Sequence, residues 1–298
     1  MVRPVRSLLF VPGNRTAWMP KAARAGADAV VFDLEGALPP AEKDQGRRAV
    51  AEVAESCGID PSQPAVMVRI NDVRSEHWRP DLDRVVVDGL HAVLLPQVAG
   101  LDDVVEVDEE LTAIESRRGL PPNSIALDPL METPQAIRQA YEIATCSPRI
   151  AYMGAGISKR GDIARTIGYR WSEEGLETLY FRSKVLLDVR AAGVVNPISG
   201  MWGGIEDLDG LRRFAEHTAG LGYEGLMVIH PSHVSVVNEV FSPPDSEIEL
   251  WTATLAAMEE AHESGNGAIR FRGEVVDEAH VLTARQGLER ARRLGVVQ

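Results

Sequence analysis

Short apolar, β-branched segments alternate with longer segments of helical periodicity along almost the whole chain. Amphipathic segments at 41–58, 101–119, 133–146 and 207–222 lie between the apolar ones, and several end in glycine, the preferred helix C-cap. This alternation predicts repeated βα units with parallel strands. The expected strands are Arg6–Val11, Ala29–Leu34, Ala65–Ile70, His91–Pro96, Ser124–Leu130, Arg149–Gly154, Val195–Gly200 and Leu226–His230.

Eight βα units favour a closed (β/α)8 TIM barrel over an open doubly wound sheet. No GxGxxG fingerprint follows the first strand, and the glycines of segment 154–161 have the wrong spacing for one. We predict an α/β fold with the catalytic barrel over residues 1–242. Residues 243–298 are surplus to a barrel and predict a C-terminal helical lid extension. It should contain a helix over 247–264 and a short β-like or loop segment, and could cover an active-site mouth.

Charge, hydropathy and cysteine usage exclude several classes of protein. The chain has 31 basic and 44 acidic residues and a net charge of −13, which argues against nucleic acid as a partner. No apolar run reaches the roughly 18 residues of a membrane span, and no secretory signal is recognisable. Cys57 and Cys146 stand alone, without a CxxC motif or a His/Cys cluster, so neither a disulfide framework nor a zinc site is expected. We expect a cytoplasmic protein without a membrane partner.

Polar residues at the ends of the expected strands are the candidates for chemistry, because the C-terminal ends of barrel strands face the active-site mouth. Acids there are costly unless they are solvated, paired or bound to a metal. Oxygen ligands suit Mg²⁺ or Mn²⁺, which keep several waters, and we predict Glu132 and Asp162 as direct ligands. Glu35 would orient metal-bound waters, and Asp33 could equally be a buried hydrogen-bonding residue. Arg69 offers a planar fork for a carboxylate.

Several segments resemble, in order, the citrate lyase β-subunit-like family of the HpcH/HpaI aldolase/citrate lyase superfamily. Relatives of that family include malyl-CoA and citramalyl-CoA lyases and, more distantly, class II pyruvate aldolases. The resemblance covers nearly the whole chain. It is carried by RSLLFVPGNR, KAARAGADAVVFDLEGAL, VMVRIN, AVLLPQV, PLMETPQAI, GDIARTIG, TLYFRSKVLLDVRAAGV, DLDGLRRFAEHTAGLGYEGLMVIHP and GEVVDEAH.

The resemblance implies a role for each matching position. Glu132 of the LxET segment and Asp162 of the GxxDL segment would bind Mg²⁺. Arg69 would grip the substrate or its enolate, and Glu35 would organise the waters of the metal. Asp277 of the tail would act as acid/base in the site of a neighbouring subunit.

The resemblance also implies a thioester substrate and an assembly. Pro12, Gly13 and Arg15 of the VPG segment would line the site near the acyl thioester and CoA. The expected reaction is Mg²⁺-dependent cleavage or formation of a 3-hydroxyacyl-CoA such as malyl-CoA or citramalyl-CoA. Cleavage leaves an enolate and requires removal of the hydroxyl proton, which a metal and a carboxylate can provide. A homo-oligomer, trimer or hexamer, is implied.

Three departures from the usual family pattern keep other functions open. Gly36 stands where an acid is expected, Gln97 and Ala99 replace Lys and Glu, and the sixth-strand loop 154–161 is lengthened. Lys159 and Arg160 in that loop could supply charge for a phosphate or a second carboxylate, or could be solvated loop residues. The alternatives are a class II aldolase on free hydroxy-oxoacids or a small-carboxylate substrate, a malyl-CoA-type thioesterase, and a non-catalytic subunit of a larger assembly.

Most candidates also have a purely structural interpretation. Glu132 and Asp162 could cap the helices that follow them, and Arg69 could form a structural salt bridge. His230 could hydrogen-bond to backbone, which keeps it out of the catalytic set, and His233 stands where relatives usually carry Gln.

Two aromatic residues are not expected to bind a cofactor. Trp171 and Tyr180 are expected on an amphipathic helix, in packing or subunit contact.

Overall fold

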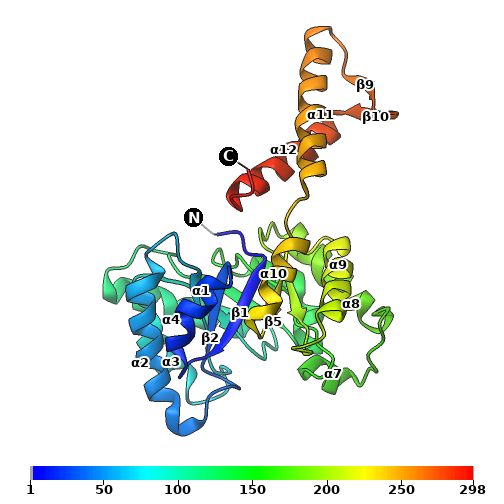
Figure 1. Cartoon of the computed structure of the whole chain (residues 1–298). Helices are drawn as coiled ribbons and strands as arrows, with labels where there is room; N and C mark the ends of the chain where they lie inside the picture. The colour runs from blue at the N-terminus through cyan, green and yellow to red at the C-terminus, as the bar shows by residue number, and fades with distance from the viewer. Residues whose placement is uncertain (1–2, 298) are drawn as a thin grey trace. The chain divides into compact units, whose positions relative to one another are not determined.

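The computed structural model describes residues 3–297 of the chain. The fold divides into two compact units, Met1–Glu239 and Val240–Gln298. Figure 1 follows the chain from the strands and helices of the first unit to the helices and hairpin of the second. Among the described residues no helix is long and apolar enough to cross a membrane.

The first unit is a barrel of eight parallel strands, which confirms the predicted (β/α)8 fold. Hydrogen-bonded neighbours follow the order β6-β5-β4-β3-β2-β1-β8-β7. Tyr152 and Asn196 form a parallel bridge between the segments leading into β6 and β7, and this bridge closes the ring. The strands are β1 (Ser7–Pro12), β2 (Ala29–Asp33), β3 (Ala65–Arg69), β4 (Leu90–Leu95), β5 (Ala126–Met131), β6 (Gly154–Ala155), β7 (Ile198–Met201) and β8 (Gly225–Val228).

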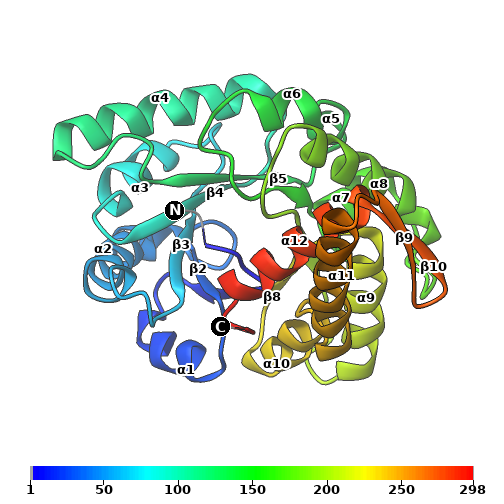
Figure 2. The same ribbon diagram turned by 90° about the horizontal axis from the view of Figure 1, so that it is seen from above.

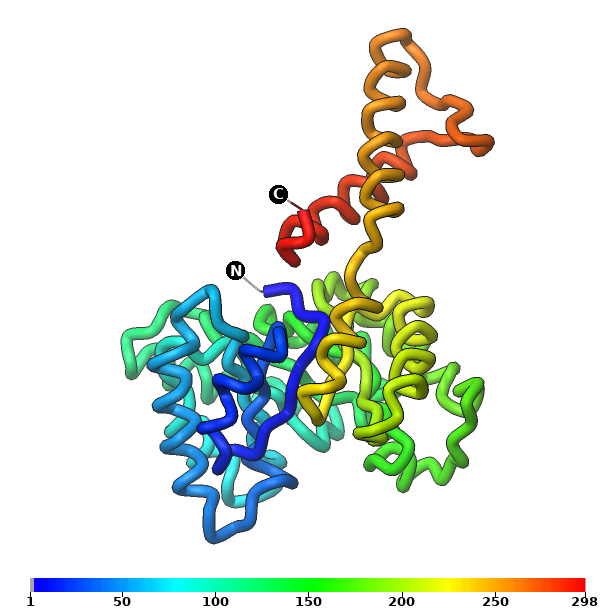
Figure 3. Tube along the Cα trace, viewed as in Figure 1, coloured from blue at the N-terminus to red at the C-terminus, as the bar shows by residue number. Residues whose placement is uncertain are grey.

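Helices surround the strands and form the outer layer of the barrel, as Figures 2 and 3 show. At least one helix follows every strand, which is the crossover that parallel pairing requires. They are η1 (Thr16–Trp18), α1 (Met19–Arg24), η2 (Pro40–Glu42), α2 (Lys43–Val53), η3 (Ala54–Gly58), α3 (Trp78–Val85), α4 (Leu101–Arg118), α5 (Pro134–Arg138), α6 (Ala140–Thr145), α7 (Asp162–Ile167), α8 (Leu176–Ala191), α9 (Leu208–Leu221) and α10 (Pro231–Val240).

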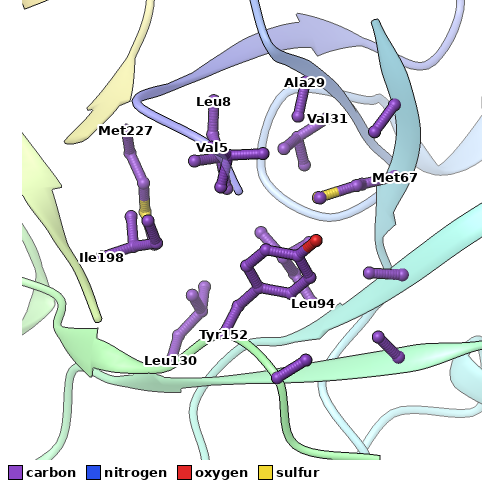
Figure 4. Packing of buried hydrophobic residues seen from close by; sticks show 14 residues of the cluster. Val5, Leu8, Ala29, Val31, Met67, Leu94, Leu130, Tyr152, Ile198 and Met227 are labelled. Atoms are coloured by element: carbon purple, nitrogen blue, oxygen red, sulfur yellow. The ribbon is translucent and has the colours of Figure 1, made fainter. Parts of the chain in front are cut away.

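Alternate side chains of the strands point inward and fill the barrel (Figure 4). Leu8, Val31, Met67 and Leu94 come from four consecutive strands and are fully buried in this core. The Tyr152 hydroxyl contacts His91 Nε2 at 2.9 Å and donates to the Arg3 carbonyl at 2.8 Å. His91 is the second residue of β4, near its N-terminal end. These contacts therefore lie toward the end of the barrel that is opposite the predicted site.

Two of the expected strands, the sixth and the seventh, are shorter than predicted by at least two residues. Within the segment 149–154, Ile150 pairs with Leu127 on one side and Tyr152 with Asn196 on the other, so only Gly154–Ala155 forms a continuous ladder. The seventh strand begins at Ile198 instead of Val195. Pro197 has no N–H to donate to a ladder, which accounts for the later start.

The expectation for the aromatic pair was wrong in two respects. Trp171 precedes α8, lies in the loop before it, and packs against Trp202 and Phe214 with ring centroids 6.2 and 5.6 Å away. Tyr180 does lie on α8, but this helix is not amphipathic, because large apolar side chains lie on its exposed face as well as on its buried face. Buried and exposed positions alternate along α8 with the period of a helix, but both sets include large apolar residues.

The second unit consists of two helices and an antiparallel hairpin: α11 (Asp245–Glu263), β9 (Ala268–Phe271), β10 (Glu274–Asp277) and α12 (Glu278–Arg293). Arg272 and Gly273 form the two-residue turn with φ of 48° and 94°, as a type I′ hairpin requires. Met258, Val276 and Val281 form its small core. The helix expected over 247–264 is α11, and the expected β-like segment is the hairpin.

Candidate active site

A cavity of about 510 Å³ opens at the C-terminal ends of the barrel strands. Its wall combines the last residue of β3 with the loops that follow β5, β6 and β7. The site therefore lies where barrel enzymes place their active sites. Its lining residues include Phe10, Arg69, Leu130, Glu132, Gly156, Lys159, Arg160, Asp162, Gly200, Trp202, Gly203, Gly204, Asp207 and Met227.

Arg69 and Asp33 form a bidentate pair across two neighbouring strands. The two residues are in register at the ends of β3 and β2. Arg69 Nε donates to Asp33 Oδ1 at 2.8 Å and Nη2 donates to Oδ2 at 2.7 Å. Asp33 also accepts from the backbone N–H of Glu35 at 2.9 Å and of Ala37 at 3.0 Å. Asp33 therefore holds both Arg69 and the loop after β2 in place.

Glu35 contacts the same guanidinium from another side, with Oε2 3.1 Å from Arg69 Nη1. Burial raises the pKa of Glu35, Arg69 opposes the rise, and the charges of Asp33 and Asp162 add to it. Burial alone lowers the pKa of Arg69, but its contacts with Asp33 and Glu35 raise it overall. Since a guanidinium has five N–H donors, the three contacts leave two donors for a ligand in the cavity.

Glu132 is the most perturbed acid that lines the cavity. Its Oε1 accepts from the backbone N–H of Gln97 at 2.8 Å and from the Gln97 side-chain amide at 3.2 Å. Burial raises the pKa of Glu132 to about 7; Gln97 and Arg69 oppose the rise, and the charges of Glu35 and Asp162 add to it. Within residues 3–297, Oε2 has no hydrogen-bond partner. One oxygen of this half-buried carboxylate is thus available to a cation.

Gln97, which follows β4, adopts a backbone conformation that non-glycine residues rarely have. Its φ is 52°, in the left-handed region. This conformation accompanies the backbone N–H bond to Glu132. Gln97, one of the residues that depart from the usual family pattern, therefore hydrogen-bonds to the predicted metal ligand Glu132.

Asp162 is the first residue of α7 and completes the acidic part of the cavity. Its Oδ1 lies 2.6 Å from Arg165 Nη2, one turn further along the helix. Its charge acts on both Glu35 and Glu132, so the three carboxylates lie close enough to repel one another. A divalent cation between them would relieve that repulsion.

The donor set fits a magnesium-type site that is completed from outside the protein. In the described part of the chain, no three His, Cys, Asp or Glu side chains form a full ligand cluster. Mg²⁺ is commonly held by one or two carboxylates and fills its shell with waters and substrate oxygens. Glu132 and Asp162 meet that requirement, and the unpartnered Oε2 of Glu132 is the observation that favours it.

Asp128 is a fully buried acid on β5, the strand that directly precedes Glu132. Asp128 shares β5 with Ala126 and Leu130, on the inward side of the barrel. Neither carboxylate oxygen of Asp128 has a hydrogen-bond partner among the described residues. Burial raises the pKa of Asp128 to about 7, and the charge of Glu132 contributes to the rise.

The three residues of the VPG segment lie outside the set that lines the cavity. Gly13 N donates to the Asp33 carbonyl at 2.9 Å, which ties the loop after β1 to the end of β2. Pro12 is the last residue of β1. The Arg15 side chain is exposed and stacks with Trp18, 6.0 Å from the ring centroid. The role implied for these residues at a thioester rests on the resemblance alone.

Asp277 belongs to the second unit, where it is the N-cap of α12. Its Oδ1 accepts from Ala279 N at 3.0 Å and lies 2.8 Å from His280 Nδ1. The contact with His280 lowers the pKa of Asp277. This exposed carboxylate has a structural role as a cap, and its role as acid/base stays a prediction.

The two histidines after β8 differ: His230 has a hydrogen-bond partner nearby, whereas neither ring nitrogen of His233 has one among the described residues. His230 Nδ1 lies 2.7 Å from the Ser232 hydroxyl and accepts from Ser232 N at 3.2 Å. His233 is fully buried in α10, and burial lowers its pKa. Neither histidine lines the cavity.

The loops after β6 and β7 bring residues to the cavity whose part in the site was not predicted. Trp202 and the glycines of segment 200–204 line it, together with the helix cap Asp207. Lys159 and Arg160 also line it, so the lengthened loop does reach the site. The strand-end rule could have found Trp202, because it directly follows β7.

The fold and the cavity define a class: a (β/α)8-barrel protein whose candidate active site brings the carboxylates of Glu35, Glu132 and Asp162 close to Arg69. The sequence matches the model of the HpcH/HpaI aldolase/citrate lyase family over residues 6–231. The chain belongs to that family, as the resemblance implied.

Characterised relatives match almost the full chain. A (3S)-malyl-CoA thioesterase of Cereibacter sphaeroides is 33% identical over 97% of this chain and 95% of its own length. An L-malyl-CoA/beta-methylmalyl-CoA lyase of Rhodobacter capsulatus is 32% identical over 94% of this chain and 92% of its own length. The crystal structure of CitE from Mycobacterium tuberculosis, which contains magnesium, acetoacetate and coenzyme A, superimposes with a TM-score of 0.73 at 27% identity, covering 97% of this chain and 98% of that one.

Proposed function

We propose that the protein is a Mg²⁺-dependent carbon–carbon lyase that cleaves or forms a 3-hydroxyacyl-CoA such as malyl-CoA or citramalyl-CoA. One observation carries the proposal: Arg69, Glu132 and Asp162 line a single cavity at the C-terminal ends of the strands. A magnesium-containing structural relative and a malyl-CoA lyase relative support it.

Glu132 and Asp162 would hold the metal, and Mn²⁺ is the alternative ion. When bound, the metal supplies positive charge where an enolate oxygen develops. Glu132 would hold it through Oε2, the carboxylate oxygen that Gln97 does not contact. Glu35 would orient the waters of the metal while it holds the Arg69 guanidinium at 3.1 Å.

Arg69 would bind the substrate with the two N–H donors that Asp33 and Glu35 do not use. Its orientation is set before the substrate arrives, because Asp33 grips it in bidentate fashion. A carboxylate or a developing enolate oxygen is the chemical group that this fork recognises best. Preorganised donors of this kind stabilise charge that forms in the transition state.

The reaction transfers one proton and breaks one bond. A carboxylate removes the 3-hydroxyl proton, the hydroxyl oxygen forms a carbonyl, and the C2–C3 electron pair moves onto the thioester as an enolate. Protonation of that carbon completes an acyl-CoA and an oxoacid. We assign the acid/base role to Asp277, because the resemblance implies it and because an exposed carboxylate is ionised near neutral pH and can accept the hydroxyl proton.

Pro12, Gly13 and Arg15 are assigned to the thioester and CoA end of the substrate, on the resemblance. We further propose a cytoplasmic homo-oligomer, a trimer or a hexamer, in which Asp277 serves the site of a neighbour.

A thioesterase is the second candidate, because the (3S)-malyl-CoA thioesterase relative is 33% identical over 97% of this chain. In that reaction a water attacks the thioester carbonyl and CoA leaves as the thiol. The same metal and Arg69 would stabilise the oxyanion.

Product analysis distinguishes the two. The protein is incubated with Mg²⁺ and (S)- or (R)-malyl-CoA, citramalyl-CoA, β-methylmalyl-CoA or free 4-hydroxy-2-oxoacids, and oxoacid and free thiol are measured separately. Oxoacid with an intact product thioester, lost in Glu132→Ala, supports the lyase. Free thiol favours the thioesterase, and cleavage of the free acids alone indicates an aldolase. No turnover of any substrate would contradict the proposal and favour a non-catalytic subunit.

A further inference from the structure

Arg182 of α8 is a buried arginine that contacts no carboxylate among the described residues. Its side chain is only 1% exposed. Its Nη2 donates to the Gly175 carbonyl at 3.1 Å and lies 3.5 Å from His217 Nδ1, and neither partner carries a negative charge. Within residues 3–297, its Nε and Nη1 have no hydrogen-bond partner. Because a guanidinium stays protonated in proteins, a positive charge with unsatisfied donors is buried here.

The other buried arginines of the described chain are paired with acids. Arg47 Nε lies 2.7 Å from Asp81 Oδ1. Arg149 Nη2 lies 2.7 Å from Glu115 Oε2. A buried charge is costly when it is left without a partner of opposite charge. Arg182 is therefore the buried arginine of this fold whose counter-charge has to come from another source.

The acids nearest to Arg182 have other partners. The charge of Glu177 acts on Arg182 from a distance, but its carboxylate accepts from the backbone N–H of Ser172 at 2.9 Å and from the Ser172 hydroxyl at 2.6 Å. Glu173 is largely exposed and lies 3.8 Å from Arg213, so those two charges offset each other. Neither acid contacts the free donors of Arg182.

A second, much smaller cavity, of about 30 Å³, adjoins Arg182 between α8, α9 and the loop before α8. Trp171, Trp202 and Phe214 form its aromatic wall, with ring centroids 5.6 to 6.2 Å apart. Trp202 Nε1 is also buried without a hydrogen-bond partner among the described residues. Since one water needs roughly 10–15 Å³ by this measure, the cavity admits a monoatomic ion or one or two waters and excludes a phosphate ester or a carboxylic acid substrate.

We propose that this small cavity binds one chloride ion, which is the counter-ion of Arg182. A water can satisfy the free N–H donors but leaves the buried positive charge uncompensated. A chloride ion does both, because it accepts charge-assisted hydrogen bonds from the guanidinium and balances its charge. Trp202 lines this cavity and the active-site cavity, so the two sites share a wall. The inference is independent of the proposed lyase activity and of its metal.

Bromide scattering tests the site directly in the wild-type protein. Bromide replaces chloride in such sites and is located by its anomalous signal. Crystals of the protein grown without chloride and soaked in sodium bromide are expected to show an anomalous peak in the small cavity, in contact with Arg182 Nε or Nη1. Water density at that position without an anomalous signal would overturn the proposal.

Thermal unfolding tests the energetic role of the ion, in EDTA and without substrate. Sodium chloride is compared with sodium gluconate at equal ionic strength, because gluconate is too large for the cavity. An ion that binds only the folded state stabilises it, so we expect chloride to raise the melting temperature saturably, by about 2–4 °C when its concentration is about five times the dissociation constant. Equal melting temperatures of the wild type in the two salts would contradict the proposal.

Arg182→Met is expected to abolish this chloride dependence, because it removes the charge and keeps an apolar side chain in the buried position. Arg212→Met is the matched control: Arg212 lies on the neighbouring helix α9, pairs with Glu239 at 2.7 Å and does not line the cavity, so its variant should respond to chloride as the wild type does. A wild-type chloride response in Arg182→Met would overturn the proposal. The bromide experiment does not depend on whether this variant folds.

Discussion

Asp128 occupies an electrostatically unfavourable position in the barrel. Its carboxylate is fully buried, and neither oxygen has a hydrogen-bond partner among the described residues. Its ionised form is opposed both by burial and by Glu132. The folded protein therefore favours the protonated acid, whereas the unfolded chain ionises at the ordinary pKa of 3.8.

We expect Asp128→Asn to stabilise the metal-free protein at pH 8. Because the folded-state pKa of about 7 lies above the unfolded value of 3.8, the contribution of Asp128 to stability is fully present below about pH 4 and is lost as the pH rises through 7. The loss is on the order of 4 kcal/mol and is absent in the Asn variant. Urea unfolding at several pH values in EDTA measures it. Equal pH dependence in the two proteins would show that Asp128 is paired or solvated.

Gln97 offers a test of how Glu132 is oriented. Gln97→Gly keeps the backbone N–H bond at 2.8 Å, removes the amide contact at 3.2 Å, and suits the φ of 52°. We expect about tenfold weaker Mg²⁺ binding by calorimetry with no loss of melting temperature. Asn123→Gly is the control, since Asn123 has a φ of 56° and does not contact Glu132. Unchanged Mg²⁺ affinity in Gln97→Gly would show that the side-chain amide of Gln97 does not contribute to metal binding.

At the scale of elements, the loop after β1 packs so closely on the end of β2 that only glycine fits. A Cβ on Gly13 would lie 2.7 Å from Leu34 Cδ2 and 3.1 Å from the Asp33 carbonyl. We expect Gly13→Ala to destabilise the protein by about 1–3 kcal/mol. Gly220→Ala in α9, where nothing lies within 4 Å, should instead stabilise it by about 0.5 kcal/mol. Thermal denaturation compares the two; equal effects would contradict the packing argument.

The strands and helices of the barrel follow from periodicity, and their exact ends do not. Runs of apolar residues were enough to predict β2 and β3, because the side chains of these strands are almost all buried on both faces of the sheet. The pattern could not show that Ile150 and Tyr152 pair with different neighbours, because pairing depends on register between distant segments. We also expected Tyr180 on an amphipathic helix, but apolar residues lie on both faces of α8. The spacing of apolar residues in the sequence does not show which helix face is exposed to solvent.

At the scale of the whole molecule, topology explains which site residues were predictable. Arg69, Glu132 and Asp162 end or follow strands, so a closed parallel barrel brings them into one cavity. The bond from Gln97 to Glu132 depends on one positive φ and on a backbone N–H, which no residue pattern encodes. The acid/base assignment of Asp277 came from resemblance alone and remains a prediction.

The central claim is that Glu132 and Asp162 form a magnesium site in the barrel. Calorimetric titration of Mg²⁺ into the metal-free protein tests it directly, with Glu132→Gln and Asp162→Asn as the variants and Asp207→Asn, another acid that lines the cavity, as the control. We predict one site per chain in the wild type and in the control, and loss of binding in both variants. Wild-type-like binding in Glu132→Gln and Asp162→Asn would contradict the account and place the metal, and the chemistry that needs it, elsewhere.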